Sequence, residues 1–266
     1  MKAVDVNGNL YASDGWGNAV RMLRPVSQPV VISSVLDGAR ASVGPVSPGK
    51  IVVIYGGGLG PSQLVRASPA NDVIGSKLSG TTVSFNGIDA PILYVSATQI
   101  GAIVPYGVSG DTAEVVVTAQ GQISTAFKVT IAASGPSIFS LNQTGAGQAA
   151  AVNGDGSLND AVHPVKTGGY ISLYATGEGQ TSPPGVDGKL LLAQPYPKPI
   201  LPVKVTVGGL PASFTYAGAA PTAVAGLMQI VVQIPAGVEP GGYVPVVLQV
   251  GNAASSSAIW IAVAAN

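Results

Sequence analysis

The hydrophobic residues of this chain fall in short, often alternating runs that are separated by glycine, proline, asparagine and aspartate. The clearest runs are Val30–Val35, Ile51–Tyr55, Thr82–Phe85, Ile92–Val95, Ile100–Val104, Glu114–Thr118 and Phe127–Ile131. A period of two residues bounded by turn residues is typical of β-strands, whereas few stretches show the 3.6-residue period of an amphipathic helix. The pattern therefore predicts an all-β protein with short strands and almost no helix, as in a sandwich or barrel.

Two stretches of the chain repeat one another. The run KIVVIYGGGLGP at 50–61 returns as YISLYATGEG at 170–179, and the strands and turns after each copy come in the same order. In both copies a pair of residues that tolerate positive φ, Asn86-Gly87 or Gly208-Gly209, separates a strand from its return partner, as in a tight hairpin. The duplication predicts two copies of one small β-domain.

The repeat divides the chain into three parts. We expect an immunoglobulin-like β-sandwich at 25–133, a second one at 134–266, and a separate N-terminal segment at 1–24. The fold class is therefore predicted as all-β, with two tandem sandwiches after a short N-terminal β-hairpin. The linker at 132–137 is short and contains Pro136, which favours a semi-rigid pair over freely tumbling domains.

The motifs PGK-IVVIYGGGLGP, TTVSFNGIDAPILYVSATQI and IVPYGV, in this order, resemble those of an IPT/TIG domain, an immunoglobulin-like sandwich. Residues 26–266 also resemble the uncharacterised C-terminal family of bacterial extracellular proteins named for Solibacter. The resemblance includes the runs GQAAAVN at 147–153 and DGS at 155–157, and it departs at Gly57, where a β-branched residue or threonine is usual. The resemblance implies a tail appended to other extracellular modules, propellers among them, and no catalytic residue can be carried over.

Residues 1–24 differ from the rest of the chain and resemble one NHL-type repeat, the blade unit of a β-propeller. The residues that carry this resemblance are Val4, Asp5, Gly8, Asn9, Leu10, Tyr11, Asp14, Asn18, Val20 and Arg21. Because a propeller needs several blades, the resemblance implies that the chain is a fragment of a longer protein, whose propeller is missing here. A plain N-terminal hairpin is the alternative.

Composition narrows the classes of function. Charged residues make up 9% of the chain, and Lys+Arg 12 balance Asp+Glu 12, so we expect no long-range attraction to nucleic acid or to an anionic membrane. The lack of cysteine excludes disulfides, thiolate catalysis and cysteine-ligated metals. The N-terminus lacks the apolar core of a signal peptide, and the apolar run at 258–265 is too short to span a membrane, so no membrane insertion is expected.

Motifs that could carry catalytic chemistry are weak. GPVSPGK at 44–50 mimics a phosphate loop, but Ile51 stands where serine or threonine is needed. GAGQAA at 145–150 fits a loose dinucleotide pattern, but turn residues follow it in place of a helix. His163 is the only histidine and precedes a proline in a loop, and one histidine cannot build a typical catalytic zinc site. We therefore predict no enzyme activity and no cofactor.

Oxygen-bearing side chains crowd the stretch 153–160. Asn153, Asp155, Asn159 and Asp160 are candidate calcium ligands, because calcium prefers clustered oxygen atoms. The glycine spacing of an EF-hand is absent, and the same residue types are expected in a polar hairpin turn. The turn is the favoured interpretation, and the calcium site stays open beside it.

The Pro-rich segment QPYPKP at 194–199 is the strongest candidate for contact with a partner. Such a segment tends to stay extended and exposed, which would present Gln194, Tyr196 and Lys198 to solvent. The partner expected for a module of this composition is a protein or a carbohydrate.

Together these features predict a non-catalytic extracellular or cell-surface module, a spacer or adhesion tail of a larger, propeller-containing protein. The alternative is a carbohydrate-binding accessory domain of a secreted enzyme. That alternative requires exposed aromatic side chains, and the two tryptophans, Trp16 and Trp260, are the first to consider. DNA binding by a Rel-like immunoglobulin domain is disfavoured, since the net charge is zero.

Overall fold

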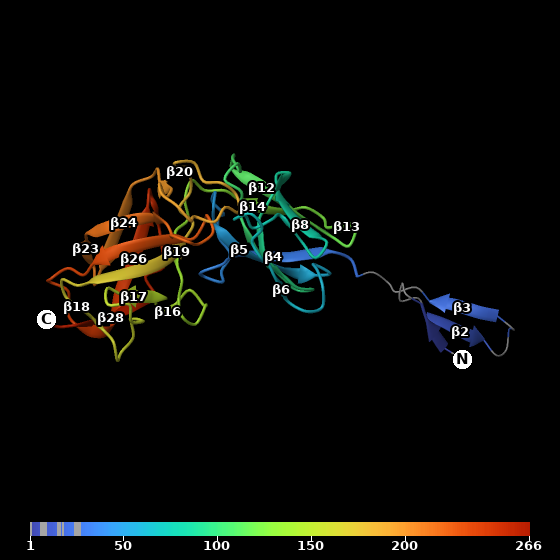
Figure 1. The fold of residues 1–266 in the computed structure, drawn as a ribbon, viewed down its shortest axis with the longest axis horizontal. Helices are drawn as coiled ribbons and strands as arrows, with labels where there is room; N and C mark the ends of the chain where they lie inside the picture. Colours follow the sequence, from blue (N-terminus) through green and yellow to red (C-terminus); the bar gives the residue numbers. More distant parts are fainter. Residues whose placement is uncertain (1, 6–9, 15–16, 18, 24–27) are drawn as a thin grey trace.

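The computed structural model describes residues 2–5, 10–14, 17, 19–23 and 28–266, which form strands and loops with no α-helix. Its N-terminal part is an antiparallel three-stranded sheet in the order β1-β2-β3, with bounds Lys2–Val4, Leu10–Asp14 and Ala19–Leu23. This sheet shares no strand with the others and is drawn apart from them in Figure 1. Gly8, Asn9, Asn18 and Trp16, which the sequence analysis names in this segment, lie outside the described residues.

The first large unit is a sandwich of two sheets. One sheet has the order β4-β5-β11-β10-β6, with bounds Val31–Asp37, Ile51–Gly57, Gln99–Ile103, Ile92–Val95 and Val65–Arg66. The other has the order β13-β12-β8-β7, with β14 paired to β12 and β9 to β8. Its bounds are Gln122–Ile123, Thr112–Ala119, Thr81–Phe85, Lys77–Leu78, Phe127–Thr130 and Ile88–Asp89.

The second large unit is built in the same way. One sheet has the order β15-β19-β25-β24, with β17 paired to β19, and the bounds are Ser137–Ile138, Tyr170–Thr176, Met228–Gln233, Phe214–Ala219 and Ala151–Asn153. The other has the order β16-β28-β26-β22-β23, with β18 paired to β28 and β27 to β26. Its bounds are Gly147–Gln148, Ile259–Ala264, Gly241–Val250, Val203–Val207, Leu210–Ala212, Val165–Lys166 and Ala253–Ala254. A separate two-stranded ribbon pairs β20 (Thr181–Ser182) with β21 (Lys198–Pro199).

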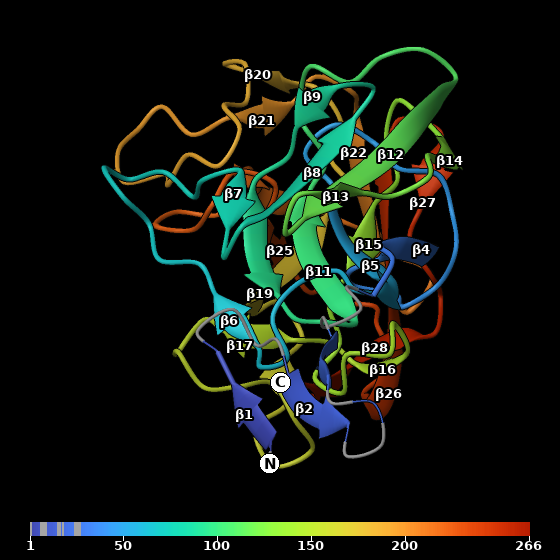
Figure 2. The ribbon, with the colours of Figure 1, turned by 90° about the vertical axis from the view of Figure 1, so that its right-hand side faces the viewer.

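The two sandwiches have corresponding strand pairings, so the prediction of tandem immunoglobulin-like sandwiches is confirmed. The central pair β5 and β11 of the first is matched by β19 and β25 of the second, and β12 with β8 is matched by β26 with β22. Side-chain details also recur: the Oγ of Ser124 accepts the amide of Val117 at 3.0 Å, and that of Ser255 accepts the amide of Leu248 at 3.0 Å. Figure 1 shows the first sandwich in blue to green and the second in yellow to red beside it, and Figure 2 shows the same ribbon turned by 90°.

Each sandwich has a hydrophobic core of its own. In the first, Ile54 and Ile100 from one sheet pack with Val83 and Val117 from the other, and all four are fully buried. The equivalent core of the second sandwich contains Leu173, Ile230, Val207 and Leu248. Burial alternates along the strands, as period-two sequence patterns require. The last core residue of the first cluster precedes the linker, and the second cluster starts at Ile138.

Two glycines in the repeated motif are required by close backbone approach. A Cβ atom at Gly56 would overlap the carbonyl oxygen of Val31 on β4, and one at Gly177 would overlap that of Gly135 in the linker. Gly177 also has φ +88°, a conformation that disfavours a side chain. Gly57, where the first copy departs from the family pattern, has open space around its Cα. The glycine clusters therefore serve contacts between neighbouring segments.

The hairpin turns also agree with the sequence. Asn86 and Gly87 have φ 50° and 78°, and Gly208 and Gly209 have φ 59° and 79°, which are the left-handed values that these positions were expected to adopt. No helix within the described residues is long and apolar enough to cross a membrane.

Candidate functional site

The joint between the sandwiches is built around Tyr106, which follows β11 in the first sandwich. Its side chain is 7% exposed, and its ring occupies the space beside Gly49 and Gly185, where a Cβ atom at either glycine would collide with the ring. Its hydroxyl donates a hydrogen bond to Oε1 of Glu178 at 2.9 Å, and its amide donates to Oδ1 of Asp187 at 2.8 Å. The tyrosine of one sandwich is therefore held by the other through side chain and backbone together.

Glu178 is the most unusual titratable group of the described residues. It is completely buried, and its Oε2 has no hydrogen-bond partner within the described part of the chain. Burial raises the pKa of this carboxyl to about 7, although the hydrogen bond from Tyr106 acts in the opposite direction. Burial, followed by the charge of Glu178, also raises the pKa of Tyr106 well above its ordinary value. Burial therefore favours the protonated form of the Glu178 carboxyl, while the hydrogen bond from Tyr106 favours the ionised form.

A second buried polar cluster joins the sandwiches through the linker. Nζ of Lys50 lies 2.7 Å from Oδ2 of Asp37 and donates to the carbonyl of Gly135 at 2.8 Å. The hydroxyl of Ser137, the first residue of β15, donates to the same Asp37 oxygen at 2.6 Å. Both charged side chains are about 5% exposed or less. This ion pair thus holds the linker against the first sandwich.

A strap from the second sandwich completes the joint. In the segment between β20 and β21, the carbonyl of Gly188 accepts the amide of Ile74 at 2.8 Å, and the amide of Leu190 donates to the carbonyl of Asp72 at 2.8 Å. The same segment carries Asp187, which holds Tyr106. The backbone of this long loop therefore extends the contact between the two sandwiches well beyond the linker.

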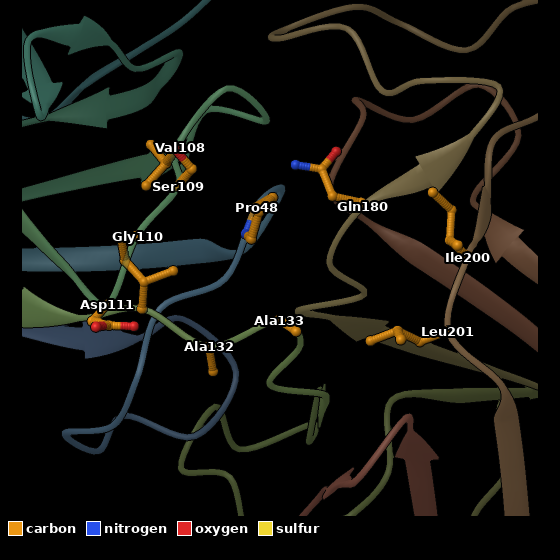
Figure 3. A pocket seen from close by; sticks show the side chains of 11 residues that line it. Pro48, Val108, Ser109, Gly110, Asp111, Ala132, Ala133, Gln180, Ile200 and Leu201 are labelled. Atoms are coloured by element: carbon orange, nitrogen blue, oxygen red, sulfur yellow. The ribbon is translucent and has the colours of Figure 1, made fainter.

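An open groove runs along the joint. It has a volume of about 480 Å³, and Figure 3 shows Val108 and Asp111 on one wall, Ile200 and Leu201 on the other, and the linker between them. Ile200 is 63% exposed, so this wall presents apolar surface to solvent. The groove continues along the linker toward Lys204 and the turn after β26. It belongs to both sandwiches and exists only in their joined arrangement.

The three residues that the sequence proposed for partner contact lie together in a second groove. Gln194, Tyr196 and Lys198 line a cavity of about 380 Å³ with Tyr216 of β24 and with Gln229 and Val231 of β25. The segment is not wholly extended into solvent, because Pro197 is buried and its carbonyl accepts the amide of Ala219 at 2.8 Å. We call this cavity the tyrosine groove. Partner binding there stays a prediction.

The four candidate calcium ligands lie between the end of β17 and Asp160, where their side chains form hydrogen bonds within the protein itself. Asn159 is fully buried, its Nδ2 donates to Oδ1 of Asn153 at 3.0 Å, and its own Oδ1 accepts the amide of Ala262 at 2.8 Å. Oδ1 of Asp155 accepts from Ser157, and Oδ1 of Asp160 accepts from His163. These hydrogen bonds lower the pKa of both exposed carboxyls. The arrangement is that of a structured polar turn, and a calcium ion there stays a prediction.

His163 belongs to the same loop. Its ring Nδ1 lies 3.2 Å from Oδ1 of Asp160, and its side chain is 57% exposed. Within the described residues, no group of three or more histidine, cysteine, aspartate or glutamate side chains is placed to hold a metal ion. The histidine therefore lies in the exposed loop position that the sequence suggested.

An aromatic pair with one exposed ring lies on the sheet of β26 and β28. The rings of Tyr243 and Trp260 have centroids 5.4 Å apart and an interplanar angle of 70°, and Tyr243 is 79% exposed. Trp260 is half-buried, while Trp16 lies outside the described residues. The edge-to-face arrangement does not form a single flat platform.

Sequence reasoning did not identify the polar residues of the joint. Lys50 ends the motif GPVSPGK and Tyr106 lies within the motif IVPYGV, and neither motif marks its residue as part of a joint. Glu178 carries one usable signal, since it is an acidic residue between two glycines immediately after a strand. Nothing local indicates that a distant tyrosine would cover it.

Comparison with protein families gives one clear match. The model of the IPT/TIG domain matches residues 31–131, which contain both sheets of the first sandwich. No curated protein sequence matches the chain.

Solved structures similar to this chain include tandem immunoglobulin-like proteins. The Bacteroides ovatus mixed-linkage glucan utilization locus protein SGBP-B, in complex with a mixed-linkage heptasaccharide, is 12% identical, with 97% of this chain and 53% of that chain covered and a TM-score of 0.37. The plexin A4 full extracellular region is 14% identical, with 91% of this chain and 19% of that chain covered and a TM-score of 0.32.

The chain thus spans about half of SGBP-B and about a fifth of the plexin chain. The I9–I11 tandem from titin is 12% identical, with 97% of this chain and 74% of that chain covered and a TM-score of 0.25. The IPT/TIG family match covers residues 31–131, and the strand order shows that these residues form the first of two immunoglobulin-like sandwiches in this chain.

Proposed function

We propose that this chain is a non-catalytic module of an extracellular or cell-surface protein, in which two immunoglobulin-like sandwiches form one stiff spacer that presents binding surfaces. The observation that carries the proposal is the joint. Tyr106 of the first sandwich is buried against Glu178 and Asp187 of the second, and the Lys50–Asp37 ion pair holds the linker. Buried polar groups that pair across a joint define one geometry, because any other geometry would leave them unpaired.

The N-terminal sheet supports the proposal that this module continues a larger protein. Val4, Val20 and Met22 are 68%, 71% and 42% exposed on a sheet of three strands. A sheet of this size gains stability when its apolar residues pack against further strands. We infer, in keeping with the resemblance to an NHL-type repeat, that these residues pack against blades of a propeller. The resemblance of residues 26–266 to the Solibacter family of bacterial extracellular tails supports the extracellular location.

Distance measurement between the sandwiches tests the stiff spacer. The chain has no cysteine, so spin labels can be attached at Lys128→Cys in β14 and Lys166→Cys in β18, both exposed, without removing native thiols. Pulsed electron–electron double resonance should give one narrow distribution of distances between the two labels. Tyr106→Ala in the same background should broaden it, while Tyr243→Ala, remote from the joint, should not. A broad distribution in the parent protein would refute the spacer.

A carbohydrate-binding accessory module is the second candidate. The specific observation in its favour is the tyrosine groove, which combines two tyrosines and two amide side chains in one cavity. Binding of purified oligosaccharides, measured by calorimetry, tests this function independently of domain geometry. Substantial turnover in a hydrolase screen would contradict the non-catalytic assignment in both candidates.

A further inference from the structure

The tyrosine groove lies on the outer face of the sheet β15-β19-β25-β24. Ile230 and Val232 of β25 are fully buried in the core, so the alternate residues Gln229 and Val231 point to the opposite face and form the floor. The Pro-rich segment before β21 covers this face and supplies the wall. The groove is therefore a surface cavity made by a loop folded over a regular sheet, with rigid residues beneath and a proline-stiffened segment above.

The groove offers hydrogen-bonding groups that the protein itself leaves uncommitted. Nε2 of Gln229 donates to Oγ of Ser172 at 3.1 Å, which leaves its carbonyl oxygen free to accept. Within the described residues, no hydrogen bond ties down the amide of Gln194 or the hydroxyl of Tyr196. Tyr196 and Tyr216 are both half-buried, so each shows part of its ring in the cavity. The cavity thus combines aromatic surface with polar side-chain atoms that are available for hydrogen bonds to a ligand.

The charge of the groove is positive. Lys198 is the one charged residue among those that line it, and its Nζ lies 5.9 Å from the centroid of the Tyr216 ring. Burial, then the charge of Glu178, raises the pKa of Tyr216, but the carboxyl of Glu178 is completely buried and does not line the cavity. An exposed ammonium group beside aromatic rings favours a ligand with an anionic substituent.

We propose that the tyrosine groove binds a sugar unit of an acidic oligosaccharide, one that carries a carboxylate or a sulfate group. A sugar ring has a face of C–H groups that packs on aromatic rings and an edge of hydroxyls that pairs with amides. Tyr196 and Tyr216 take the face, Gln194 and Gln229 the hydroxyls, and Lys198 the acidic group. The volume of about 380 Å³ lies within the range of small-molecule sites. The inference rests on the second function proposed above and specifies its site and ligand class.

Titration calorimetry on the full chain tests the site and the ligand class separately. The probes are a tetragalacturonate, a sulfated carrageenan tetrasaccharide that carries no carboxylate, and neutral cellotetraose. We expect saturable binding of at least one acidic probe and at least tenfold weaker binding of the neutral one. Raising the salt concentration should weaken the acidic interaction, because the contact with Lys198 is exposed and screened. The two acidic probes distinguish a carboxylate from a sulfate ligand.

Variants locate the binding. Tyr196→Ala should reduce affinity for the acidic probe at least tenfold, and Lys198→Met should remove the preference for acidic over neutral probes. Tyr243→Ala removes an exposed aromatic residue on the other sheet and should leave affinity unchanged. All three positions are solvent-accessible, and circular dichroism with thermal melting verifies folding.

The outcomes that overturn the inference are distinct. If the chain binds an acidic probe but Tyr196→Ala retains full affinity, the site is wrong and the carbohydrate function survives. If the neutral probe binds as tightly as the acidic ones, the ligand class is wrong. If no probe binds, the inference and the carbohydrate function both fail, while the stiff spacer is untouched.

Discussion

The hydroxyl of Tyr106 lies 2.9 Å from Oε1 of Glu178, which joins the first sandwich to the second by a hydrogen bond that is buried on both sides. The other carboxyl oxygen of Glu178 has no hydrogen-bond partner among the described residues. The joint thus depends on a carboxyl group whose charged form is poorly solvated. This relationship makes the contact between the domains sensitive to small chemical changes.

Tyr106→Phe should destabilise the joint while leaving its shape intact. The substitution removes only the hydroxyl, so Oε1 of Glu178 would also become unpaired in a buried position. The expected loss is about 1–3 kcal/mol, the usual cost of an unsatisfied buried polar group. Urea unfolding monitored by tryptophan fluorescence measures it. Tyr243→Phe is the matched control, because Tyr243 is 79% exposed and should change stability by less than about 0.5 kcal/mol.

The buried Glu178 should make stability fall as pH rises from 5 to 8. The pKa of this carboxyl is raised from 4.5 to about 7 in the folded chain. Well below pH 4.5 the carboxyl is protonated in both the folded and the unfolded chain, so it does not change the free energy of unfolding. Between these values the unfolded chain ionises first, and the folded state becomes less stable by about 1.4 kcal/mol per pH unit, or roughly 3 kcal/mol in all.

Glu178→Gln isolates this effect. The glutamine carbonyl can still accept the Tyr106 hydroxyl, but the side chain does not titrate. The free energy of unfolding of the parent, measured in urea at pH 5 and pH 8, should fall by roughly 3 kcal/mol more than that of the variant. Parallel pH profiles for the two proteins would contradict the buried, unpaired carboxyl. The partly buried Asp187, whose pKa burial also raises, is common to both proteins and cancels in the comparison.

Replacing Lys50 alone should lower the free energy of unfolding more than replacing both Lys50 and Asp37, the ion pair that contacts the linker. Lys50→Met leaves the carboxylate of Asp37 buried without its cation, and losses for such changes are about 3–5 kcal/mol. Adding Asp37→Asn should recover a large part of that loss, because the amide carries no charge and its oxygen can still accept the amides of Ala39 and Arg40. A double-mutant cycle in urea measures both terms. Equal and additive losses would show that the pair does not act as a unit.

Substitution by alanine should destabilise the protein strongly at Gly56 and hardly at all at the adjacent Gly57. Gly56→Ala would push a Cβ atom into the carbonyl of Val31 and force β4 away from β5, with an expected loss of roughly 3 kcal/mol. Gly57→Ala meets open space and should change stability by about 0.5 kcal/mol or less. Thermal unfolding of the two variants side by side is sufficient. Equal melting temperatures would mean that the approach of β4 is not as close as described.

Much of the fold could be predicted because its signals are local. The run Ile92–Val95 is a strand with the same bounds that the alternation of residues predicted, and Ile51–Tyr55 is extended by two residues to Gly57. A strand is recognised from its own side chains, and a hairpin from two residues that accept positive φ. The Pro-rich composition around Gln194 and Tyr196 predicts an extended, exposed segment. Its packing against β24 could not be predicted from that composition.

The amino-acid order by itself determined that this is a duplicated all-β chain, because period-two alternation and turn residues specify strands wherever they lie in space. Only the tertiary structure decided which polar groups meet across the joint. Tyr106 and Glu178 are 72 residues apart, and Asp37 and Ser137 are 100 apart. The local sequence around each partner does not indicate which distant residue it meets. The packing of one sandwich on the other removes water from these groups and thereby pairs them.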